Sequence, residues 1–457
     1  MASSGARRTR LTRRGRIVAW TVGVTSAVVL GVAGVGAWVY QDLDGNISSA
    51  DVDDKIGGDR PENLSPGSKN ILVVGSDSRD GANAKYGKDL TTMQSDTLMV
   101  LHVPASRKWA TVVSFPRDSW VEIPACDRGG GDKSSPHHAK INEAFALGGS
   151  SGEVSGAAAC SIKTVEARTG LRIDHFMSVD FQGFKGMVDA LDGIEVCPEE
   201  AIHSEKARLD MEAGCQTVAG EKALGYVRVR YGVGNGSDIG RIGRQQEFMN
   251  ALVEKAQDRL TSPTSLYGFL KSATKSLTTD PDLAGIKPLY SLASELKGIP
   301  SDRLTFVTVP NYPREADVPT DKANVVWQYP HATDLFSRLA KDKEVDGDRL
   351  KAQTKVPLYA SSVKVQVLNG TSTPGLANTV AGKLREAGLT VTGTGNAPEP
   401  SATTQITYPS GQEQQARALA AHAPGAPAPR EAGAGAGAAA GVITLVVGDD
   451  LDVDRIR

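Results

Sequence analysis

The stretch "ILVVGSDSRD", residues 71–80, joins an apolar run to a charged tip and decides the fold of the region around it. The four apolar residues before Gly75 predict a buried strand, and the glycine marks the point where the backbone can turn. The side chains of Asp77, Arg79 and Asp80 then follow. A solvated strand end is the ordinary explanation of one such tip, so its role depends on what the rest of the chain supplies.

Strand and helix patterns alternate after this first strand. Apolar runs at "DTLMVLHV", "KWATVVSFPRD" and "RLTFVTVP" predict further strands, whereas apolar spacing of three to four predicts helices near 239–260 and 265–276. This alternation predicts an α/β/α sandwich around a mainly buried mixed sheet. From residue 361, "VKVQVLNGT", "PGLANTVAGKLREAGL" and "GVITLVVGD" repeat the alternation and predict a second, small α/β domain.

The 457 residues leave room for two or three domains. Composition divides the chain into a basic tail at 1–16, an apolar span at 17–40, a linker at 41–69, the main α/β domain at 70–345, a linker at 346–360, the small domain at 361–449 and a tail at 450–457.

The amino terminus predicts a membrane anchor. Arginines stand at positions 7, 8, 10, 13, 14 and 16, and the segment 17–40 that follows carries no charge. This segment is long enough for one transmembrane helix, with Trp20, Trp38 and Tyr40 near its ends. The arginines would stay in the cytoplasm, so we expect a single-pass protein of the cell membrane with its domains outside. The alternative is a cleaved signal peptide, but a signal core is normally shorter, about 7–15 residues.

Charge and cysteine content narrow the class of protein. The formal net charge is −2, which removes a whole-protein case for nucleic-acid binding. The four cysteines all lie in the part expected outside and none forms a CxxC pair, so disulfides are favoured over zinc or redox chemistry. Three connectivities are open; we favour Cys126–Cys160 and Cys197–Cys215, because the second pair flanks one short excursion between apolar segments.

Charged and amide side chains recur at the ends of the predicted elements. They are Asp77, Arg79, Asp96, Arg117, Asp118, Lys140, Arg228, Arg230, Arg241, Arg244 and Gln245. Arg228 and Arg230 alternate in "YVRVRYG", which we interpret as a strand with both on one face. Arg241, Arg244 and Gln245 have the spacing of one helix face. Each group alone would be explained as a surface ion pair or a solvated face.

Together these groups indicate a phosphate ligand. The planar donor fork of arginine suits phosphate oxygens, and several arginines suit a ligand with several such oxygens. Two acids beside a phosphate require a cation between them, and Mg²⁺ prefers one or two carboxylates together with phosphate oxygens. We therefore predict that Asp77 and Asp96 hold Mg²⁺ (or Mn²⁺) beside a diphosphate.

Seven motifs in order carry a family resemblance: "ILVVGSDSR", "SDTLMV", "SFPRDSWVEIP", "KINEAF", "IDHFMSVDFQGFKGMVDALDGIEV", "ALGYVRVRYG" and "DIGRIGRQQ". Over roughly 70–342 the chain resembles the LytR-CpsA-Psr family of cell-wall glycopolymer ligases. The part from residue 361 resembles the carboxy-terminal domain often appended to such proteins. The resemblance makes 70–345 the catalytic domain.

The resemblance implies a transferase that moves a phosphoglycosyl polymer from a polyprenyl diphosphate carrier to a peptidoglycan hydroxyl, with pyrophosphatase activity as a side reaction. It places metal-binding acids at Asp77 and Asp96, and the diphosphate-binding set at Arg117, Arg228, Arg230, Arg241 and Gln245, with Lys140 in the lysine motif. Many members have an arginine where this chain has Gln94. That phosphate contact is either missing in this chain or supplied by Arg79 or Arg244.

Three other functions can be weighed against the sequence. A membrane-tethered receptor could hold a lipid diphosphate or a wall polymer without turnover. A membrane-linked transcription regulator is disfavoured, because the basic tail has no helix-turn-helix pattern. A serine or cysteine hydrolase is disfavoured as well, because the sequence contains no GxSxG.

Overall fold

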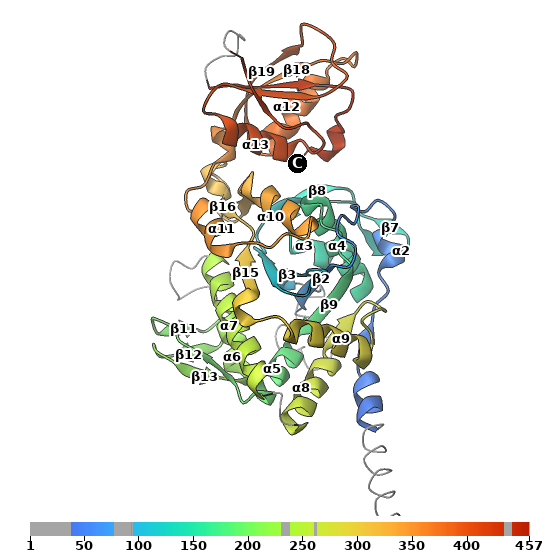
Figure 1. Ribbon diagram of the computed structural model, residues 1–457, viewed down its shortest axis with the longest axis vertical. Coiled ribbons are helices and arrows are strands. Elements are labelled where there is room, and N and C mark those ends of the chain that lie inside the picture. Colours follow the sequence, from blue (N-terminus) through green and yellow to red (C-terminus); the bar gives the residue numbers. More distant parts are fainter. Residues whose placement is uncertain are drawn as a thin grey trace, which may run out of the picture.

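A mixed seven-stranded sheet forms the centre of the larger α/β region (Figure 1). The computed structural model describes residues 38–76, 93, 95–229, 238–259, 263–433 and 441–456. The strand order is β1-β14-β9-β2-β3-β4-β15. The strands are β1 (Ser48–Ser49), β2 (Lys69–Ser76), β3 (Ser95–Val103), β4 (Ala110–Phe115), β9 (His175–Asp180), β14 (Leu277–Thr279) and β15 (Leu304–Thr308). Because β2 is parallel to β9 and antiparallel to β3, the prediction of a mixed sheet is confirmed.

Helices cover both faces of this sheet. On one face lie α3 (Glu143–Gly148), α4 (Val154–Thr169) and α10 (His331–Ala340). On the other face α9 (Ile286–Lys297) packs Leu292 against Ile71. Successive residues of a strand point to opposite faces, so β2 places Leu72 in the first core and Ile71 in the second. This is the α/β/α arrangement that the alternating pattern predicts.

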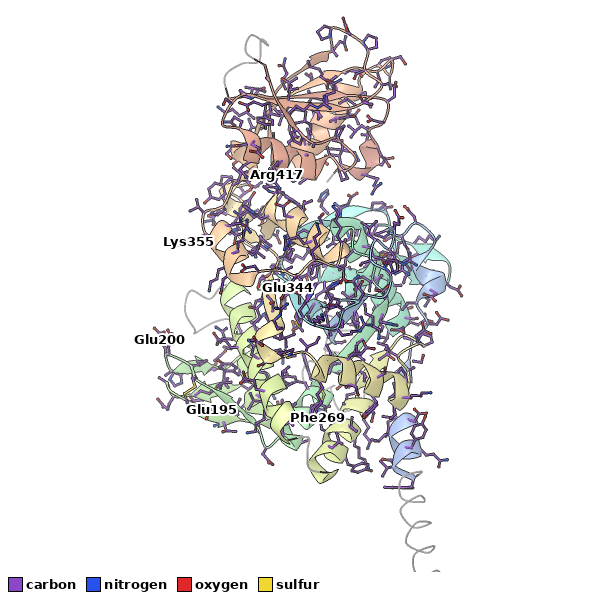
Figure 2. The ribbon with its side chains drawn as sticks, viewed as in Figure 1. Glu195, Glu200, Phe269, Glu344, Lys355 and Arg417 are labelled. Atoms are coloured by element: carbon purple, nitrogen blue, oxygen red, sulfur yellow. A yellow bond between two sulfur atoms is a disulfide. The ribbon has the colours of Figure 1, made fainter. Side chains whose placement is uncertain are left out.

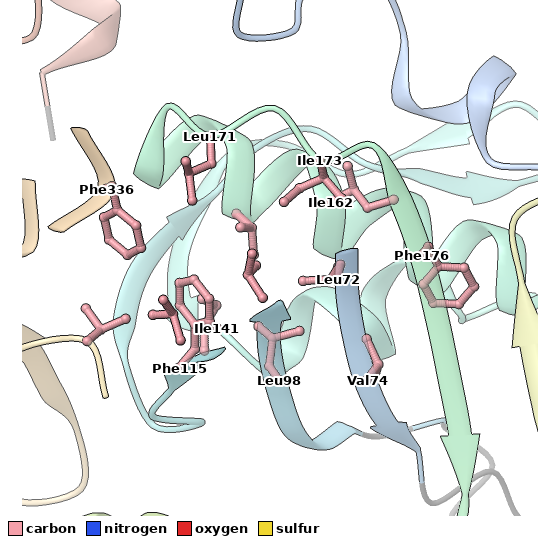
Figure 3. Close-up of a cluster of buried hydrophobic side chains, with 14 of the residues drawn as sticks. Leu72, Val74, Leu98, Phe115, Ile141, Ile162, Leu171, Ile173, Phe176 and Phe336 are labelled. Carbon is pink, nitrogen blue, oxygen red and sulfur yellow. The ribbon is translucent and has the colours of Figure 1, made fainter. Parts of the chain in front are cut away.

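The larger of the two cores lies between the sheet and α4 (Figure 3). Leu72, Val74 and Leu98 from the strands face this core and are almost fully buried. The rings of Phe115 and Phe336 stack with their centroids 5.8 Å apart and join α10 to the sheet. Burial of each of these apolar side chains contributes roughly 1.5–3 kcal/mol, and together they hold the helices on the sheet.

A second layer of helices extends one end of the sheet. It contains α5 (Phe181–Ala190), α6 (Gly220–Arg228), α7 (Asp238–Arg259) and α8 (Pro263–Lys275), together with the small antiparallel pairs β10 (Ile194–Val196) with β13 (Gln216–Val218) and β11 (Ile202–Ser204) with β12 (Leu209–Met211). Val188, Leu209, Tyr226 and Phe248 belong to its separate apolar core.

The strand predicted at "YVRVRYG" is wrong, because residues 220–228 form helix α6. Ala223 and Tyr226 are buried there against the hairpin β11–β12 and α7, which favours the helix over an extended chain. The helix ends at Arg228, and the backbone of the next residue, Val229, is no longer helical (φ −60°, ψ 131°). Arg228 is therefore the last residue of a helix and not one of an alternating strand pair.

Shorter elements complete the larger α/β region. They are α2 (Asp53–Ile56), β5 (Trp120–Ile123), β6 (Asp127–Gly129), β7 (Asp132–Lys133), β8 (His137–Lys140), β16 (Asn311–Pro313), β17 (Val325–Trp327) and α11 (Gly347–Gln353). Both expected disulfide pairs are present, Cys126–Cys160 and Cys197–Cys215.

The carboxy-terminal domain has a five-stranded sheet of order β19-β18-β22-β20-β21. Its elements are β18 (Lys364–Asn369), α12 (Leu376–Glu386), β19 (Thr390–Asn396), β20 (Gln405–Tyr408), α13 (Glu413–His422), β21 (Arg430–Glu431) and β22 (Ile443–Val447). The sequence pattern missed β19, because "TVTGTGN" alternates threonine and glycine without an apolar run. Figure 2 shows Arg417 on the side of this domain that faces α10, where it pairs with Asp334 at 2.8 Å.

Three segments expected to be linkers or a tail are packed instead. In the segment 41–69, Leu43, Val52 and Ile56 are buried and Ser48 pairs with Thr278 of the main sheet, so the linker expected there is wrong. Helix α11 occupies the start of the linker expected at 346–360. The expected tail 450–457 contributes Leu451 and Ile456 to the core of the small domain. Isolated apolar residues within otherwise polar stretches make these contacts.

The membrane span expected at 17–40 lies outside the described residues, apart from residues 38–40. Among the residues that are described, none of the helices combines the length and the apolar character needed to cross a bilayer.

Gly148 and Gly156 allow α3 and α4 to cross at backbone contact. A Cβ at Gly148 would lie 2.1 Å from the Gly156 carbonyl oxygen, so Gly148→Ala must push the two helices apart. We expect the free energy of unfolding of the larger α/β domain to fall by roughly 1–3 kcal/mol. The matched control is Gly268→Ala in α8, where the nearest atom to the new Cβ is 3.8 Å away. Chemical denaturation should show this control unchanged or slightly stabilised, and equal stability of both variants would contradict the packing argument.

Candidate active site

One cavity of about 180 Å³ collects charged side chains from five separate parts of the chain. It is lined by Asp96, Arg117, Ser204, Lys206, Ala207, Arg228, Arg241 and Gln245. Since a water molecule occupies about 30 Å³ in the liquid, the cavity has room for a diphosphate-sized group. Five of these residues belong to the site predicted from the sequence: Asp96, Arg117, Arg228, Arg241 and Gln245.

The antiparallel pairing of β3 and β4 places Asp96 beside Arg117. Leu98 of β3 pairs with Phe115 of β4. Asp96 precedes Leu98 by two residues and Arg117 follows Phe115 by two, so their side chains meet at the same end of the two strands. Arg117 Nη1 donates a hydrogen bond of 2.6 Å to Asp96 Oδ1. Gly75 of β2 lies opposite Thr97, where a Cβ would be 3.1 Å from the threonine Cβ. A glycine at this position lets the ends of β2 and β3 approach closely.

Arg228 reaches the same carboxylate from the end of α6. Its Nε lies 3.6 Å from Asp96 Oδ2. Its guanidinium carbon lies 4.5 Å from the centroid of the Phe181 ring, at the start of α5. The ring limits where the guanidinium can go, and such a contact contributes about 0.5–1 kcal/mol at a partly exposed position. Asp96 therefore lies between two arginines that come from distant parts of the chain.

Helix α7 supplies Arg241 and Gln245 and fixes the end of α6. Arg241 is 3% exposed. Gln245 Nε2 donates to the Val227 carbonyl at 2.9 Å and lies 3.4 Å from Thr97 Oγ1 on β3. Arg244 donates to the Val229 carbonyl at 2.6 Å and does not line the cavity. Its contact thus holds the chain just after Arg228, and burial lowers the pKa of its guanidinium.

The described lining carries three arginines and one lysine against one carboxylate. A cavity of this charge favours a multiply charged anion, and arginine forks bind phosphate oxygens through paired hydrogen bonds. The described geometry therefore suits phosphate or diphosphate binding.

Lys140 does not line this cavity. Its Nζ donates to Asp118 Oδ1 at 2.7 Å, and the same Asp118 oxygen lies 3.7 Å from Arg117 Nε. Asp118 is 4% exposed, so a buried carboxylate connects the lysine to the arginine of the site. Lys140 thus supports Arg117 through Asp118.

Five residues named near the expected site are outside the described residues: Asp77, Arg79, Asp80, Gln94 and Arg230. Their roles remain predictions.

A separate group of possible metal ligands lies at the opposite end of the central strands. His175, Asp280 and Asp282 place one ligand atom each within 4.8 Å of one another. His175 pairs with Ile71 at the opposite end of β2 from Asp96. The Asp280 carboxylate accepts hydrogen bonds from the backbone N–H groups of Phe176 and Leu283, and hydrogen bonding to this carboxylate raises the pKa of His175. These contacts give the cluster a structural explanation.

Sequence reasoning missed the residues that the hairpin β11–β12 brings to the cavity. Ser204, Lys206 and Ala207 lie at its turn. A Cβ on Gly225 of α6 would lie 2.9 Å from the Ala207 carbonyl oxygen, so the turn rests directly on α6. The Cys197–Cys215 disulfide closes the base of this excursion. In the sequence only the Cys197–Cys215 pair indicated a closed segment here. Nothing in the sequence indicated that the turn of the hairpin would reach the cavity.

Comparison with known proteins assigns the chain to a family. Residues 39–354 match the LytR_cpsA_psr family, and residues 362–451 match the domain described as LytR cell envelope-related transcriptional attenuator. The cell wall biosynthesis protein LcpA of Corynebacterium glutamicum is 30% identical over 83% of this chain and 76% of its own length.

A second relative is the polyisoprenyl-teichoic acid–peptidoglycan teichoic acid transferase TagU of Enterococcus faecalis. It is 29% identical over 58% of this chain and 79% of its own. The solved LytR-Csp2A-Psr enzyme from Actinomyces oris shares 19% identity over 64% of this chain and 96% of its own, with a TM-score of 0.47.

Lys206 should contribute to the binding of a phosphate anion in this cavity. We expect Lys206→Ala to weaken binding of inorganic pyrophosphate about three- to tenfold, because one partly exposed cation is lost from the lining. Isothermal titration at low and high salt would measure the change, which should shrink as salt rises. Lys222→Ala is the matched control, since Lys222 is an exposed lysine of α6 that does not line the cavity. An equal effect of the two substitutions would contradict the assignment.

Proposed function

The chain belongs to the LytR-CpsA-Psr family, and from that premise we propose that it is an extracytoplasmic transferase of cell-wall glycopolymers. Its substrate would be a phosphoglycosyl polymer carried on a polyprenyl diphosphate, and its acceptor a peptidoglycan hydroxyl. The segment 17–40 would anchor it in the cell membrane with the amino terminus in the cytoplasm. The cavity that joins Asp96, Arg117, Arg228 and Arg241 is the observation that carries this proposal.

The relatives support the transferase class. TagU of Enterococcus faecalis is named a transferase of polyisoprenyl-linked teichoic acid to peptidoglycan, and LcpA of Corynebacterium glutamicum a cell wall biosynthesis protein. A polyisoprenyl carrier linked through a diphosphate presents the multi-oxygen anion for which the arginine lining is suited.

The proposed reaction is a displacement at phosphorus. The acceptor hydroxyl oxygen forms a bond to the phosphorus that carries the sugar, and the bond from this phosphorus to the bridging oxygen breaks. Polyprenyl phosphate leaves with that oxygen, and the hydroxyl proton passes to a carboxylate, Asp77 or Asp96. In such reactions the protein mainly positions the groups and stabilises charge on phosphate oxygens, the role proposed for Arg117, Arg228 and Arg241. Water in place of the acceptor would give the pyrophosphatase side reaction.

A divalent cation fits the donor set at Asp96. This carboxylate lines the cavity and its side chain is 19% exposed, so one of its oxygens can face a ligand. Mg²⁺ binds readily through one or two carboxylates together with phosphate oxygens, so Asp96 with Asp77 would hold Mg²⁺ (or Mn²⁺). When bound, the metal would neutralise charge on the diphosphate.

Removal of either arginine should abolish most transfer. We expect Arg117→Ala and Arg228→Ala to reduce the rate by about 10²–10³-fold, because each removes a charge-matched donor from the reacting phosphates. The assay combines the full chain, Mg²⁺, a labelled polyprenyl-diphosphate saccharide and peptidoglycan fragments, and it quantifies covalent product. Arg303→Ala is the control, since Arg303 forms a surface pair with Glu344. Near-normal turnover in both site variants would refute the assignment, and donor binding without product would favour the receptor.

The metal requirement can be tested separately. We expect chelation to stop transfer and added Mg²⁺ or Mn²⁺ to restore it. Asp96→Asn should shift the Mg²⁺ concentration needed for half-maximal activity upward by about tenfold or more, because one anionic ligand is lost. Titration of activity against Mg²⁺ in both proteins measures this shift. An unchanged Mg²⁺ dependence in Asp96→Asn would show that Asp96 is not a ligand.

A further inference from the structure

Large apolar side chains are exposed at one end of the catalytic region. Within the described residues seven large hydrophobic side chains are exposed, and four of them lie on three neighbouring elements. Trp38 and Tyr40 are 58% and 49% exposed in the helical turn at 38–44, Leu266 is 38% exposed on α8, and Tyr290 is 73% exposed on α9. Such side chains are costly to leave in water unless a partner covers them.

Direct contacts hold these three elements together. The rings of Trp38 and Tyr267 have centroids 6.4 Å apart, and the Tyr267 hydroxyl donates to Asp42 at 2.9 Å. The Ile286 N–H at the start of α9 donates to Asp44 Oδ1 at 2.9 Å. The turn at 38–44 is thus fixed to both α8 and α9. In Figure 1 these elements lie at the opposite end of the molecule from the carboxy-terminal domain.

Lysines accompany the apolar side chains. Helix α8 carries Lys275 and also Lys271, whose Nζ lies 3.4 Å from Asp42 Oδ2, and it has no acid. Helix α9 carries Lys287 one turn before Tyr290 on its exposed side. Aromatic residues mixed with lysines are typical of surfaces at the boundary between lipid and water. The rings enter the headgroup layer, and the ammonium groups meet anionic lipid phosphates. A surface that binds another protein is normally depleted in lysine.

We propose that Trp38, Tyr40, Leu266 and Tyr290, with Lys271, Lys275 and Lys287, form a membrane-contact face that holds the catalytic region against the outer surface of the bilayer. The position of the chain selects this occupant, because the uncharged segment 17–40 leads directly into the face. The inference rests on the membrane anchoring included in the proposed function. It adds a second attachment, made by α8 and α9, that limits rotation of the catalytic region about its anchor.

This attachment would have a consequence for the reaction. A lipid-linked diphosphate stays at the level of the headgroups, so a catalytic region fixed on the bilayer meets its donor by diffusion in two dimensions. The carboxy-terminal domain lies at the far end of the molecule and would extend away from the membrane (Figure 1). The membrane-contact face would therefore increase the rate at which the enzyme meets its lipid-linked donor, and it would leave the rate of the chemical step unchanged.

Photocross-linking in nanodiscs tests the contact directly. A benzoylphenylalanine at position 290 of the full chain, placed in discs of phosphatidylcholine and phosphatidylglycerol, should give phospholipid adducts detectable by mass spectrometry. The control position is Val356, which is 81% exposed and lies in the segment between α11 and the carboxy-terminal domain. We expect at least tenfold more adduct at 290 than at 356. Equal yields, or none at 290 in protein retained by the discs, would overturn the proposal.

A kinetic test distinguishes this face from the proposed function. The double substitution Lys287→Glu with Tyr290→Ser should raise the KM for a long-chain donor in proteoliposomes about threefold or more. It should leave kcat, and turnover of a short-chain donor in solution, unchanged. An unchanged KM in proteoliposomes would overturn the face while leaving the transferase intact. Absence of transfer in the parent protein would overturn the proposed function, and failure to enter the discs would overturn the anchoring.

Discussion

The ion pair between Asp96 and Arg117 is the contact around which the candidate site is built. It joins the start of β3 to the residue that follows Pro116 at the end of β4, at 2.6 Å. Arg228 approaches the other oxygen of the same carboxylate, so the sheet and the second helical layer meet at one side chain. A carboxylate shared by two cations keeps both guanidinium groups close together despite their mutual repulsion. A polyanion that enters the cavity would therefore find Arg117 and Arg228 already positioned next to each other.

Supporting contacts show why the arginines can hold these positions. Phe181 lies against the Arg228 guanidinium, Asp118 lies beside Arg117, and Gln245 ties α7 to both α6 and β3. Side chains that are held before the ligand arrives lose less conformational entropy on binding. The hairpin β11–β12 adds a wall to the cavity and is itself held by a disulfide and by its buried residues. The site therefore depends on packing well beyond its lining.

The sequence allowed the sheet and much of the site to be predicted, because both leave local patterns. The apolar run at 71–74 predicted β2, and the charged residues near the ends of β3 and β4 predicted Asp96 and Arg117. Arg228 lines the cavity together with other predicted residues, but the alternation of valine and arginine in "VRVR" wrongly predicted a strand there. The helix there depends on contacts of Ala223 and Tyr226 with distant elements, which periodicity over four residues does not reveal. Lys206 was missed for the same reason, since only tertiary packing on Gly225 brings the hairpin turn to the cavity.

A crystal structure with a phosphorothioate analogue of a short polyprenyl diphosphate would test the central claim most directly. Anomalous scattering from its sulfur locates the diphosphate without assumption about the site. The account predicts this signal inside the cavity, with phosphate oxygens within hydrogen-bond distance of Arg117, Arg228 and Arg241. A fully occupied analogue bound elsewhere, with these three arginines contacting only protein groups, would contradict it.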